Sequence, residues 1–247
     1  MARFFLHNDQ IADQVVTIIG DDAHHISRVL RLQPGDVIEC VDEDEYLHVV
    51  ELKQLGHTIT GQVLTTSKVS QESPLHLTLF QGLAKGDKMD LVMQKAVELG
   101  VQEIVPFTSR YTVVKLTEKQ AISRQERWER IAYEAAKQSG RTRLPTIHKL
   151  QGFPEVLASI KDRTARGELV FLAYEGEVQQ RLKGIELAQP SFASVLIGPE
   201  GGFSEEEVGD LIEVGAESLS LGPRILRTET AGIVALSLLG YKWGDLG

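Results

Sequence analysis

The chain has 247 residues, of which 42% are hydrophobic and 25% are charged, so it can bury a core and is not expected to be disordered. Its formal net charge is -9, which argues against nonspecific coating of nucleic acid, because phosphate binding needs cations. The single cysteine, Cys40, excludes an intrachain disulfide and a cysteine-rich zinc site, and it fits a reducing compartment.

The first ten residues, MARFFLHNDQ, contain too short an apolar run for a signal peptide. No apolar run elsewhere approaches the roughly 20 residues that are needed to span a bilayer. The sequence therefore predicts a cytoplasmic protein.

Residues 1–72 alternate short runs rich in Val, Ile and Thr with polar turns. A helix is expected over 21–32, where apolar residues have helical spacing and basic residues lie near the end. Strands are expected over 3–6, 37–42, 46–55 and 59–66. Short strands at this spacing predict a compact β-barrel domain, which the polar, proline-ended linker 67–74 follows.

Residues 73–247 alternate strands with helices. The expected strands are 75–83, 101–107, 168–175, 193–200 and 217–222, and the expected helices are 87–100, 117–140, 153–160, 204–215 and 230–243. Asp87 is placed to cap the first helix, and Ser204 with Glu207 predicts a capping box at the fourth. This alternation predicts an α/β domain with a mostly parallel sheet that helices cover on both faces.

The charge is unevenly distributed along the chain. Residues 119–149, which we call the basic segment, hold eight Lys or Arg and three Glu. Their local net charge is +5, which leaves -14 for the remainder of the chain. A basic patch on an acidic protein suits one specific anionic target. A solvated helix face with ion pairs three and four residues apart explains the segment equally well.

Three expected strand ends carry residues that a plain turn does not need. They are 172–175 (LAYE), 198–202 (GPEGG) and 222–230 (GPRILRTET). In open α/β sheets ligands bind beyond the carboxyl ends of strands, and glycines let a ligand approach the backbone closely. Tight turns and caps would explain each segment alone, but their repetition favours a binding site.

A phosphate-binding nucleotide site is the first alternative. The sequence contains neither Gly-x-x-x-x-Gly-Lys-Ser/Thr nor a Gly-x-Gly-x-x-Gly that opens a helix after a strand. Four carboxylates surround the second loop: Glu200, Glu205, Glu206 and Glu207. They would repel a phosphate, whereas they tolerate a neutral or cationic ligand such as an adenosine that bears a sulfonium.

The segments VLIGPEGGFSEEE (195–207) and LSLGPRILRTETA (219–231) resemble the two signature stretches of the bacterial 16S rRNA (uracil-1498-N3)-methyltransferases, a family of the SPOUT superfamily. Three further segments are similar to that family in the same order: HHISRVLRLQPGD, KGDKMDLVMQKAVELGV and EAAKQSGRTRLP. The resemblance implies an RNA-binding PUA-like barrel over 1–72 and an α/β domain over 73–247 that ends in a deep trefoil knot. It also implies S-adenosylmethionine as the cofactor and a homodimer.

The resemblance further implies that the cofactor lies among the three loops. Its expected contacts are Leu172, Gly198, Pro199, Glu200, Gly201, Gly202, Leu221, Gly222, Ile225, Leu226 and Thr230. The family holds the adenine largely through backbone groups, which accounts for the glycines, and the apolar members of this set are expected to wall it.

Methyl transfer to N3 of uracil requires the N3 proton to leave, so a general base or an anion-stabilising cation is needed. Glu229 is the candidate base, and Arg224, Arg227 and Arg141 are candidate cations. A structural alternative remains for three of them: Arg224 or Arg227 pairs with Glu200 or Glu229 as part of the scaffold, and Glu229 serves only the dipole of the last helix. No cluster of His, Cys and Asp has metal-ligand spacing, so no metal is expected.

The expected RNA contacts are basic residues of the first helix and of the basic segment: Arg28, Arg31, Lys137, Arg141 and Arg143. Proteins that read RNA sequence favour unpaired bases that are splayed out and stacked. Because most of the chain is acidic, we expect weak binding to naked RNA. The expected target is 16S rRNA within the small ribosomal subunit.

The helix expected over 230–243 is apolar on all sides, and such a helix must be buried on all sides. One sheet covers only one of those sides. A second copy of the chain or the core of the monomer would provide the remaining burial, and the family resemblance favours the homodimer.

Three other functions remain open from the sequence. One is a noncatalytic rRNA-binding assembly factor with a vestigial cofactor pocket. Another is a SPOUT methyltransferase with a different RNA target. The third is a nucleotide-binding metabolic enzyme, which the missing phosphate motifs disfavour.

Overall fold

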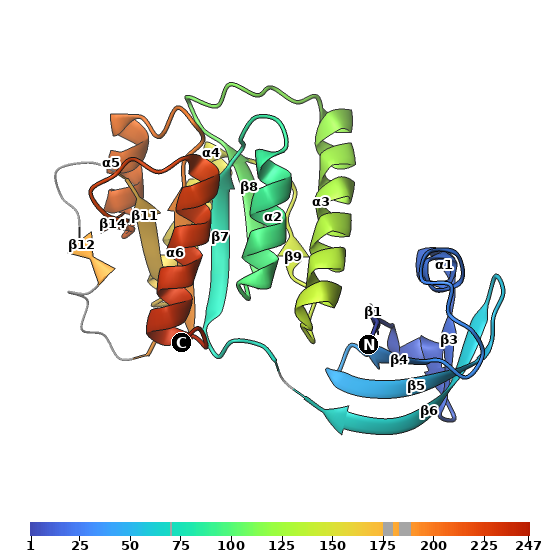
Figure 1. Cartoon of the computed structure of the whole chain (residues 1–247). Coiled ribbons are helices and arrows are strands. Elements are labelled where there is room, and N and C mark those ends of the chain that lie inside the picture. Colours follow the sequence, from blue (N-terminus) through green and yellow to red (C-terminus); the bar gives the residue numbers. More distant parts are fainter. Residues whose placement is uncertain (70, 175–179, 183–188) are drawn as a thin grey trace. The chain divides into compact units, whose positions relative to one another are not determined.

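The computed structural model describes residues 1–69, 71–174, 180–182 and 189–247 (Figure 1). The chain forms two compact units. The smaller unit contains Met1–Glu72 and Ala136–Arg143, and the larger unit contains Ser73–Ala135 and Leu144–Gly247. The basic segment therefore contributes eight residues to the smaller unit, which the sequence did not indicate.

The smaller unit is built on a curled sheet with the strand order β1-β4-β5-β6-β3-β2 (Figure 1). The strands are β1 (Arg3–Phe5), β2 (Ile11–Ala12), β3 (Val15–Ile18), β4 (Val37–Val41), β5 (Tyr46–Gln54) and β6 (Ile59–Lys68). β1 and β4 are parallel, and the other pairs are antiparallel. Register shifts along the long β5–β6 pair bend it, as β-bulges do. The predicted barrel-like β fold is confirmed.

The helical part of this unit is shorter than expected. A 3-10 turn, η1 (Asn8–Gln10), precedes α1 (Gly20–His24), and α1 continues into a π-helical stretch, η2 (His25–Val29). Ile26 is fully buried with Phe4 in the core of the sheet. The helix ends before Arg31, because Arg31 has a φ of 54°, which is left-handed backbone. Arg28 and Arg31 are both exposed.

The larger unit is an α/β structure around a sheet with the order β10-β8-β7-β13-β11-β14-β12, and β9 pairs with β8. The strands are β7 (His76–Gly82), β8 (Glu103–Thr108), β9 (Thr146–Ile147), β10 (Gln151–Gly152), β11 (Leu169–Ala173), β12 (Gln180–Arg181), β13 (Phe192–Ile197) and β14 (Glu217–Ser220). Every pair in the described part of this sheet is parallel. The predicted parallel sheet is confirmed.

Helices cover both faces of that sheet (Figure 1). On one side α6 (Thr228–Trp243) packs on β7 and β13 and contacts α2 (Lys88–Glu98). On the other side α4 (Phe153–Ala165) and α5 (Glu205–Glu213) bury a core that includes Phe80, Val156 and Leu211. An ion pair between Arg127 and Asp90 joins α3 (Glu118–Ser139) to α2.

One of the two predicted helix caps is present. Ser204 and Glu207 form the capping box of α5: the Ser204 N–H donates to the Glu207 carboxylate at 2.9 Å, and the Glu207 N–H donates to the Ser204 hydroxyl at 3.3 Å. Asp87 precedes α2, but within the described structure its side chain makes no capping hydrogen bond, so that prediction is wrong.

The trefoil knot stays a prediction. Among the described helices, none combines the length and the apolar character that a membrane crossing needs.

Candidate functional site

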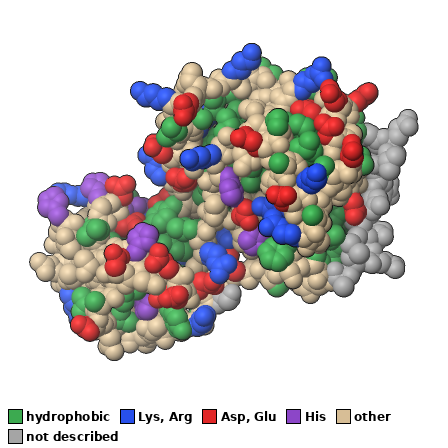
Figure 2. Space-filling model, turned by 180° about the vertical axis from the view of Figure 1, so that it is seen from behind, with side chains coloured by type: hydrophobic (Ala, Val, Ile, Leu, Met, Phe, Trp, Pro, Cys, Tyr) green, Lys and Arg blue, Asp and Glu red, His purple; other side chains and the backbone are tan. Residues whose placement is uncertain are grey.

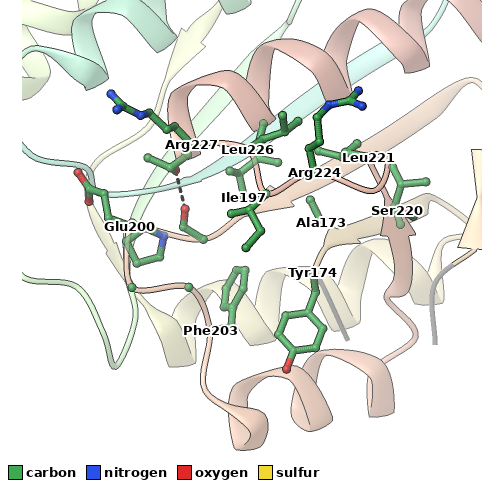
Figure 3. A pocket seen from close by; sticks show the side chains of 18 of the residues that line it. Ala173, Tyr174, Ile197, Glu200, Phe203, Ser220, Leu221, Arg224, Leu226 and Arg227 are labelled. Atoms are coloured by element: carbon green, nitrogen blue, oxygen red, sulfur yellow. Dashed lines mark hydrogen bonds between the residues drawn. The ribbon is translucent and has the colours of Figure 1, made fainter. Parts of the chain in front are cut away.

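A cavity of about 550 Å³ lies at the carboxyl ends of β11, β13 and β14 (Figure 3). Its lining comes from residues 173–174, 197–203, 219–222 and 224–228, with Lys88 and Ala231. Cavities that hold small ligands have volumes of about 300–1,000 Å³. The three strand ends singled out in the sequence therefore meet at one cavity of suitable size.

Most of the expected cofactor contacts lie in that lining: Gly198, Pro199, Glu200, Gly201, Gly202, Leu221, Gly222, Ile225 and Leu226. Leu172 is instead fully buried in the core. Its two successors, Ala173 and Tyr174, line the cavity in its place. Thr230 is exposed and lies outside the described lining, and Glu175 lies outside the described residues.

The cavity also contains residues that were not among the expected cofactor contacts: Lys88, Ala173, Tyr174, Ile197, Phe203, Leu219, Ser220, Thr228 and Ala231. Several of them lie next to the glycine-rich stretches, so their position in the chain could have indicated that they line the cavity. Lys88 comes from the start of α2, far along the chain from the loops that line the cavity, and nothing in its own segment marked it as a cavity residue.

The glycines shape the loops more by packing than by leaving space for a ligand. A Cβ on Gly82, at the end of β7, would lie 2.3 Å from the Pro199 nitrogen. A Cβ on Gly201 would lie 2.7 Å from the Tyr111 Cβ. Gly202 and Gly222 have φ values of 70° and 114°, which other residues rarely adopt. The tight turn predicted at Gly222 is thus supported by its backbone.

A hydrogen-bond chain joins the two signature stretches. The Thr228 hydroxyl, in the first residue of α6, donates to the Gly198 carbonyl at 2.6 Å (Figure 3). The Gln81 amide on β7 in turn donates to the Thr228 hydroxyl at 2.9 Å. Gln81 and Thr228 are both buried, so these contacts hold the loop after β13 against the helix start without competition from water.

One cation lies between two carboxylates at the edge of the cavity. The Lys88 ammonium is 3.0 Å from a Glu200 oxygen and 3.6 Å from Oε2 of Glu229. The hydrogen bond to Glu200 is the main reason that the pKa of Lys88 is raised. Glu229 is 13% exposed, and its Oε2 is buried without a hydrogen-bond partner in the described residues. Glu229 thus faces Lys88 and does not belong to the described lining.

The candidate arginines lie in different places. Arg224 and Arg227 are exposed and line the cavity, but their side chains point away from Phe203 and Tyr174 (Figure 3). Arg141 is only 4% exposed and donates to the Glu72 carboxylate within the smaller unit. Arg141 is therefore held in an ion pair within the smaller unit, and only Arg224 and Arg227 remain as candidate cations in the described lining.

Other cations of the basic segment are paired as well. Lys137 lies 3.5 Å from an Asp22 oxygen and 4.5 Å from the centre of the Phe4 ring. Arg143 pairs with Glu45. Figure 2 shows Lys and Arg scattered among acidic side chains on the face in view. These contacts favour ion pairing as the explanation of this segment, with Asp22, Glu72 and Glu45 as partners from distant parts of the chain.

Among the residues that the structure describes, no group of three or more His, Cys, Asp or Glu could hold a metal ion. The cavity thus offers backbone groups, apolar side chains and a few charges at its edge, which suits an organic ligand.

Comparisons with known proteins identify the family of this chain. The family described as RNA methyltransferase domain matches residues 71–240, and the family described as RNA methyltransferase PUA domain matches residues 18–60. The ribosomal RNA small subunit methyltransferase E of Bacillus subtilis (strain 168) is 36% identical over 98% of this chain and 97% of its own. That of Buchnera aphidicola subsp. Schizaphis graminum is 33% identical over 95% and 93%.

A solved structure is similar over the whole chain. The ribosomal RNA small subunit methyltransferase E from Neisseria gonorrhoeae, bound to S-adenosyl methionine, is 32% identical, covers 100% of both chains and has a TM-score of 0.90. The resemblance that the signature stretches indicated is confirmed. This chain belongs to the RNA methyltransferase family, in the group of the ribosomal RNA small subunit methyltransferases E.

Proposed function

We propose that this protein transfers a methyl group from S-adenosylmethionine to N3 of uridine 1498 of 16S rRNA in the small ribosomal subunit. Family membership supports rRNA methylation, and the S-adenosyl methionine bound to the relative from Neisseria gonorrhoeae supports the cofactor. The choice of N3 and of this uridine rests on the resemblance of the signature stretches. The observation that carries the proposal is that both stretches line one cavity.

The cavity fits the proposed cofactor by its chemistry. Ile197, Leu221 and Leu226 give it apolar walls suited to a purine ring, and the loop 198–202 offers backbone donors and acceptors. Glu200 at the edge favours a cationic sulfonium over a phosphate. Burial acts to raise the pKa of Glu200, but the Lys85 amide and the Lys88 ammonium outweigh it, so the pKa is lowered and the carboxylate stays charged.

When bound, S-adenosylmethionine supplies an electrophilic methyl group. The residues of the chain must hold the uracil in line with that methyl group, exclude water from the transfer step and assist loss of the N3 proton. We assign Arg224 and Arg227 to stabilising the negative charge that spreads over the uracil oxygens, because both cations line the cavity. We do not assign the role of general base to Glu229, because its buried Oε2 faces Lys88; the N3 proton passes to water instead, and the two arginines stabilise the resulting anion.

The proposed RNA contacts are Arg28 and Arg31, which are exposed in the smaller unit. Lys137 and Arg141 are not included, because both are largely buried in contacts within that unit. Arg143 is more than half exposed but pairs with Glu45, so it would have to exchange that partner for a phosphate. This supply of cations in the described part of the smaller unit fits recognition of a folded subunit better than tight binding to naked RNA.

A homodimer in the cytoplasm is part of the proposal. On α6, Ala235, Leu236 and Leu239 are buried in the monomer, whereas Val234 and Leu238 are only half-buried. These two residues lie one turn apart and form an apolar row that a second copy would cover. Sedimentation at micromolar concentration should show a dimer, and a single 27.3 kDa species would contradict this part of the proposal.

The test of the whole proposal is mass spectrometry of 16S rRNA from a strain that lacks the gene, with and without the restored gene. We expect 3-methyluridine at position 1498 to disappear and to return. Calorimetry with S-adenosylmethionine accompanies it. Unchanged rRNA together with no binding of the cofactor would favour a noncatalytic assembly factor, and a different lost nucleotide would reassign the target.

A further inference from the structure

The loop between β8 and α3 presents a row of side chains to solvent. Exposure alternates along it: Tyr111, Val113 and Lys115 are exposed, and the residues between them are half-buried. Tyr111 is 48% exposed and Val113 is 59% exposed. An aromatic ring, an apolar side chain and a cation therefore lie on one side of this segment, which we call the 111–115 strip.

The backbone that carries Tyr111 is fixed. The Arg110 N–H donates to the Glu207 carboxylate at 2.7 Å, and the Arg110 guanidinium donates to Glu206 at 2.9 Å. The neighbouring Ser109 N–H donates to the Thr112 hydroxyl at 2.8 Å. A ring on a backbone held in this way loses little conformational entropy when a ligand stacks on it.

The strip begins next to the cavity. The Cβ and the carbonyl oxygen of Tyr111 lie 2.7 and 2.9 Å from where a Cβ on Gly201 would be, and Gly201 is part of the cavity lining. Figure 1 shows the loop leaving β8 and passing over the upper end of the larger unit to α3. A nucleotide on Tyr111 would therefore lie beside the opening where the methylated base must enter.

The cation of the strip is available for a ligand. Lys115 is exposed and makes no hydrogen bond or ion pair with the residues that the structure describes. In the basic segment half of the cations are instead paired with carboxylates, namely Arg127, Lys137, Arg141 and Arg143. An ammonium without a protein partner can contact a phosphate without breaking an existing ion pair.

We propose that the 111–115 strip binds an unpaired nucleotide of the substrate RNA, with the base stacked on Tyr111 and a phosphate at Lys115. Tyrosine rings stack on single-stranded bases of any sequence, and a nearby cation holds the backbone. This inference rests on the proposed function, because it takes the substrate to be RNA. It adds a contact for the nucleotide beside the methylated one.

The test uses the full-length protein and small ribosomal subunits that lack the methyl group. Cofactor binding by calorimetry and methyl transfer by the wild type are measured first, because their failure would refute the proposed function and not the strip. The variants are Tyr111→Ala, Tyr111→Leu and Tyr111→Phe. The matched control is Phe192→Ala, which removes a ring that is 52% exposed at the opposite end of β13.

We expect Tyr111→Ala and Tyr111→Leu to raise KM for the subunits by about fivefold to a hundredfold, with kcat and cofactor affinity little changed. Tyr111→Phe keeps the ring and should keep KM, as should Phe192→Ala. Lys115→Met should reduce the slope of log affinity against log salt by about 0.7. An unchanged KM for Tyr111→Ala, or a KM for Tyr111→Leu equal to that of the wild type, would overturn the proposal.

A photoreactive phenylalanine at position 111 separates RNA from protein as the occupant. We expect irradiation with the small subunit to crosslink this position to rRNA. Crosslinks to ribosomal proteins alone would mean that the loop docks on protein, and the proposal would be wrong even if KM rises.

Discussion

The two ends of the sheet in the larger unit differ in the groups that they present. At the carboxyl end the chain forms the cavity mostly from glycine-rich backbone and apolar side chains. At the amino end polar side chains fill the space between strands with ion pairs. Glu103, the first residue of β8, accepts hydrogen bonds from His76, His148 and Arg163 at 2.9, 3.0 and 2.9 Å.

The cluster at the amino end extends further through Arg163. This side chain also donates to Glu168 and to Thr78, both at 3.0 Å, and Glu168 accepts from the Ser194 hydroxyl. Every charge in the cluster thus has a protein partner. A fully satisfied network has no group left for a ligand, so this end stabilises the fold, whereas the carboxyl end leaves backbone groups available.

The largest effect that we predict is for Gly82→Ala at the carboxyl end. The new Cβ would lie 2.3 Å from the Pro199 nitrogen and 2.6 Å from the Gly198 carbonyl carbon, so the loop must move. We expect a loss of about 3 kcal/mol in the free energy of unfolding, at the upper end of overpacking effects. We also expect cofactor binding to be lost. Chemical denaturation measures the change in stability, and calorimetry measures cofactor binding.

Gly209→Ala is the matched control for that substitution. Gly209 lies within α5, and a Cβ there would meet nothing within 4 Å. Alanine in a helix interior stabilises by about 0.5–1 kcal/mol relative to glycine. If Gly82→Ala were as harmless as Gly209→Ala, the loop after β13 would not be fixed by β7, and the comparison between the two ends would lose its basis.

The next effect is for Glu103→Gln at the amino end. The glutamine cannot serve the three donors that Glu103 binds, and we expect the free energy of unfolding to fall by about 2 kcal/mol at pH 7, less than for a fully buried pair. Affinity for the cofactor should not change, because the cavity is at the other end of the strands. A matching loss of cofactor affinity would show that the two ends are not independent.

The contribution of Glu103 to stability should depend on pH. Hydrogen bonds from His148 and His76 and the charge of Arg163 lower the pKa of Glu103 well below its ordinary value. A lowered carboxyl pKa contributes stability above the ordinary value, near 4.3, and loses it as the pH falls toward the folded-state pKa. The difference in stability between wild type and Glu103→Gln should therefore shrink as the pH falls below about 4.3. A constant difference would contradict this assignment.

Thr228→Val should have a smaller effect. It keeps the shape of the side chain but removes the hydroxyl that joins Gln81 to the Gly198 carbonyl. Leaving buried polar groups unpaired costs about 1–3 kcal/mol. We expect the free energy of unfolding to fall by about 1 kcal/mol and cofactor binding to weaken. Ser237→Ala is the control on the same helix, because among the residues that the structure describes the Ser237 hydroxyl bonds only to the Ile233 carbonyl. Equal cofactor affinity in both variants would exclude a role for Thr228 in holding the loop.

Local patterns predicted the main elements of the fold. The apolar runs indicated β7, β8, β11, β13 and β14, and the spacing of Ser204 and Glu207 predicted their capping box. The strands β9, β10 and β12 have only two residues each, which is too short for any periodic signal. The helix over 21–32 was too long by a few residues, because a left-handed residue at Arg31 has no signature in the sequence.

The site was predictable where it follows a strand end and not where it depends on contacts between distant residues. Leu172 was chosen over Ala173 and Tyr174, because a buried parallel strand is apolar on both faces and does not indicate which residue faces the cavity. Arg141 was assigned to RNA and to the active site, but its partner Glu72 is 69 residues away. Charge spacing along the chain cannot indicate such a pair.

The smallest effect is expected for Lys88→Met, which removes the ion pairs at the carboxyl end. Lys88 is 32% exposed, in contrast to Arg163 at 12%, so solvent screens its pairs with Glu200 and Glu229. Chiefly through the hydrogen bond to Glu200, the pKa of Lys88 is raised. The contribution of Lys88 to stability is therefore present below the ordinary pKa near 10.4 and is lost as the pH rises through the raised value.

At pH 7 we expect Lys88→Met to lower the denaturation midpoint less than Thr228→Val does, and we expect the difference from wild type to vanish in high salt. Lys88→Arg, which keeps the charge, should match the wild type. A loss of stability as large as that of Glu103→Gln would mean that side-chain charge holds both ends of the sheet, and the contrast between them would fail.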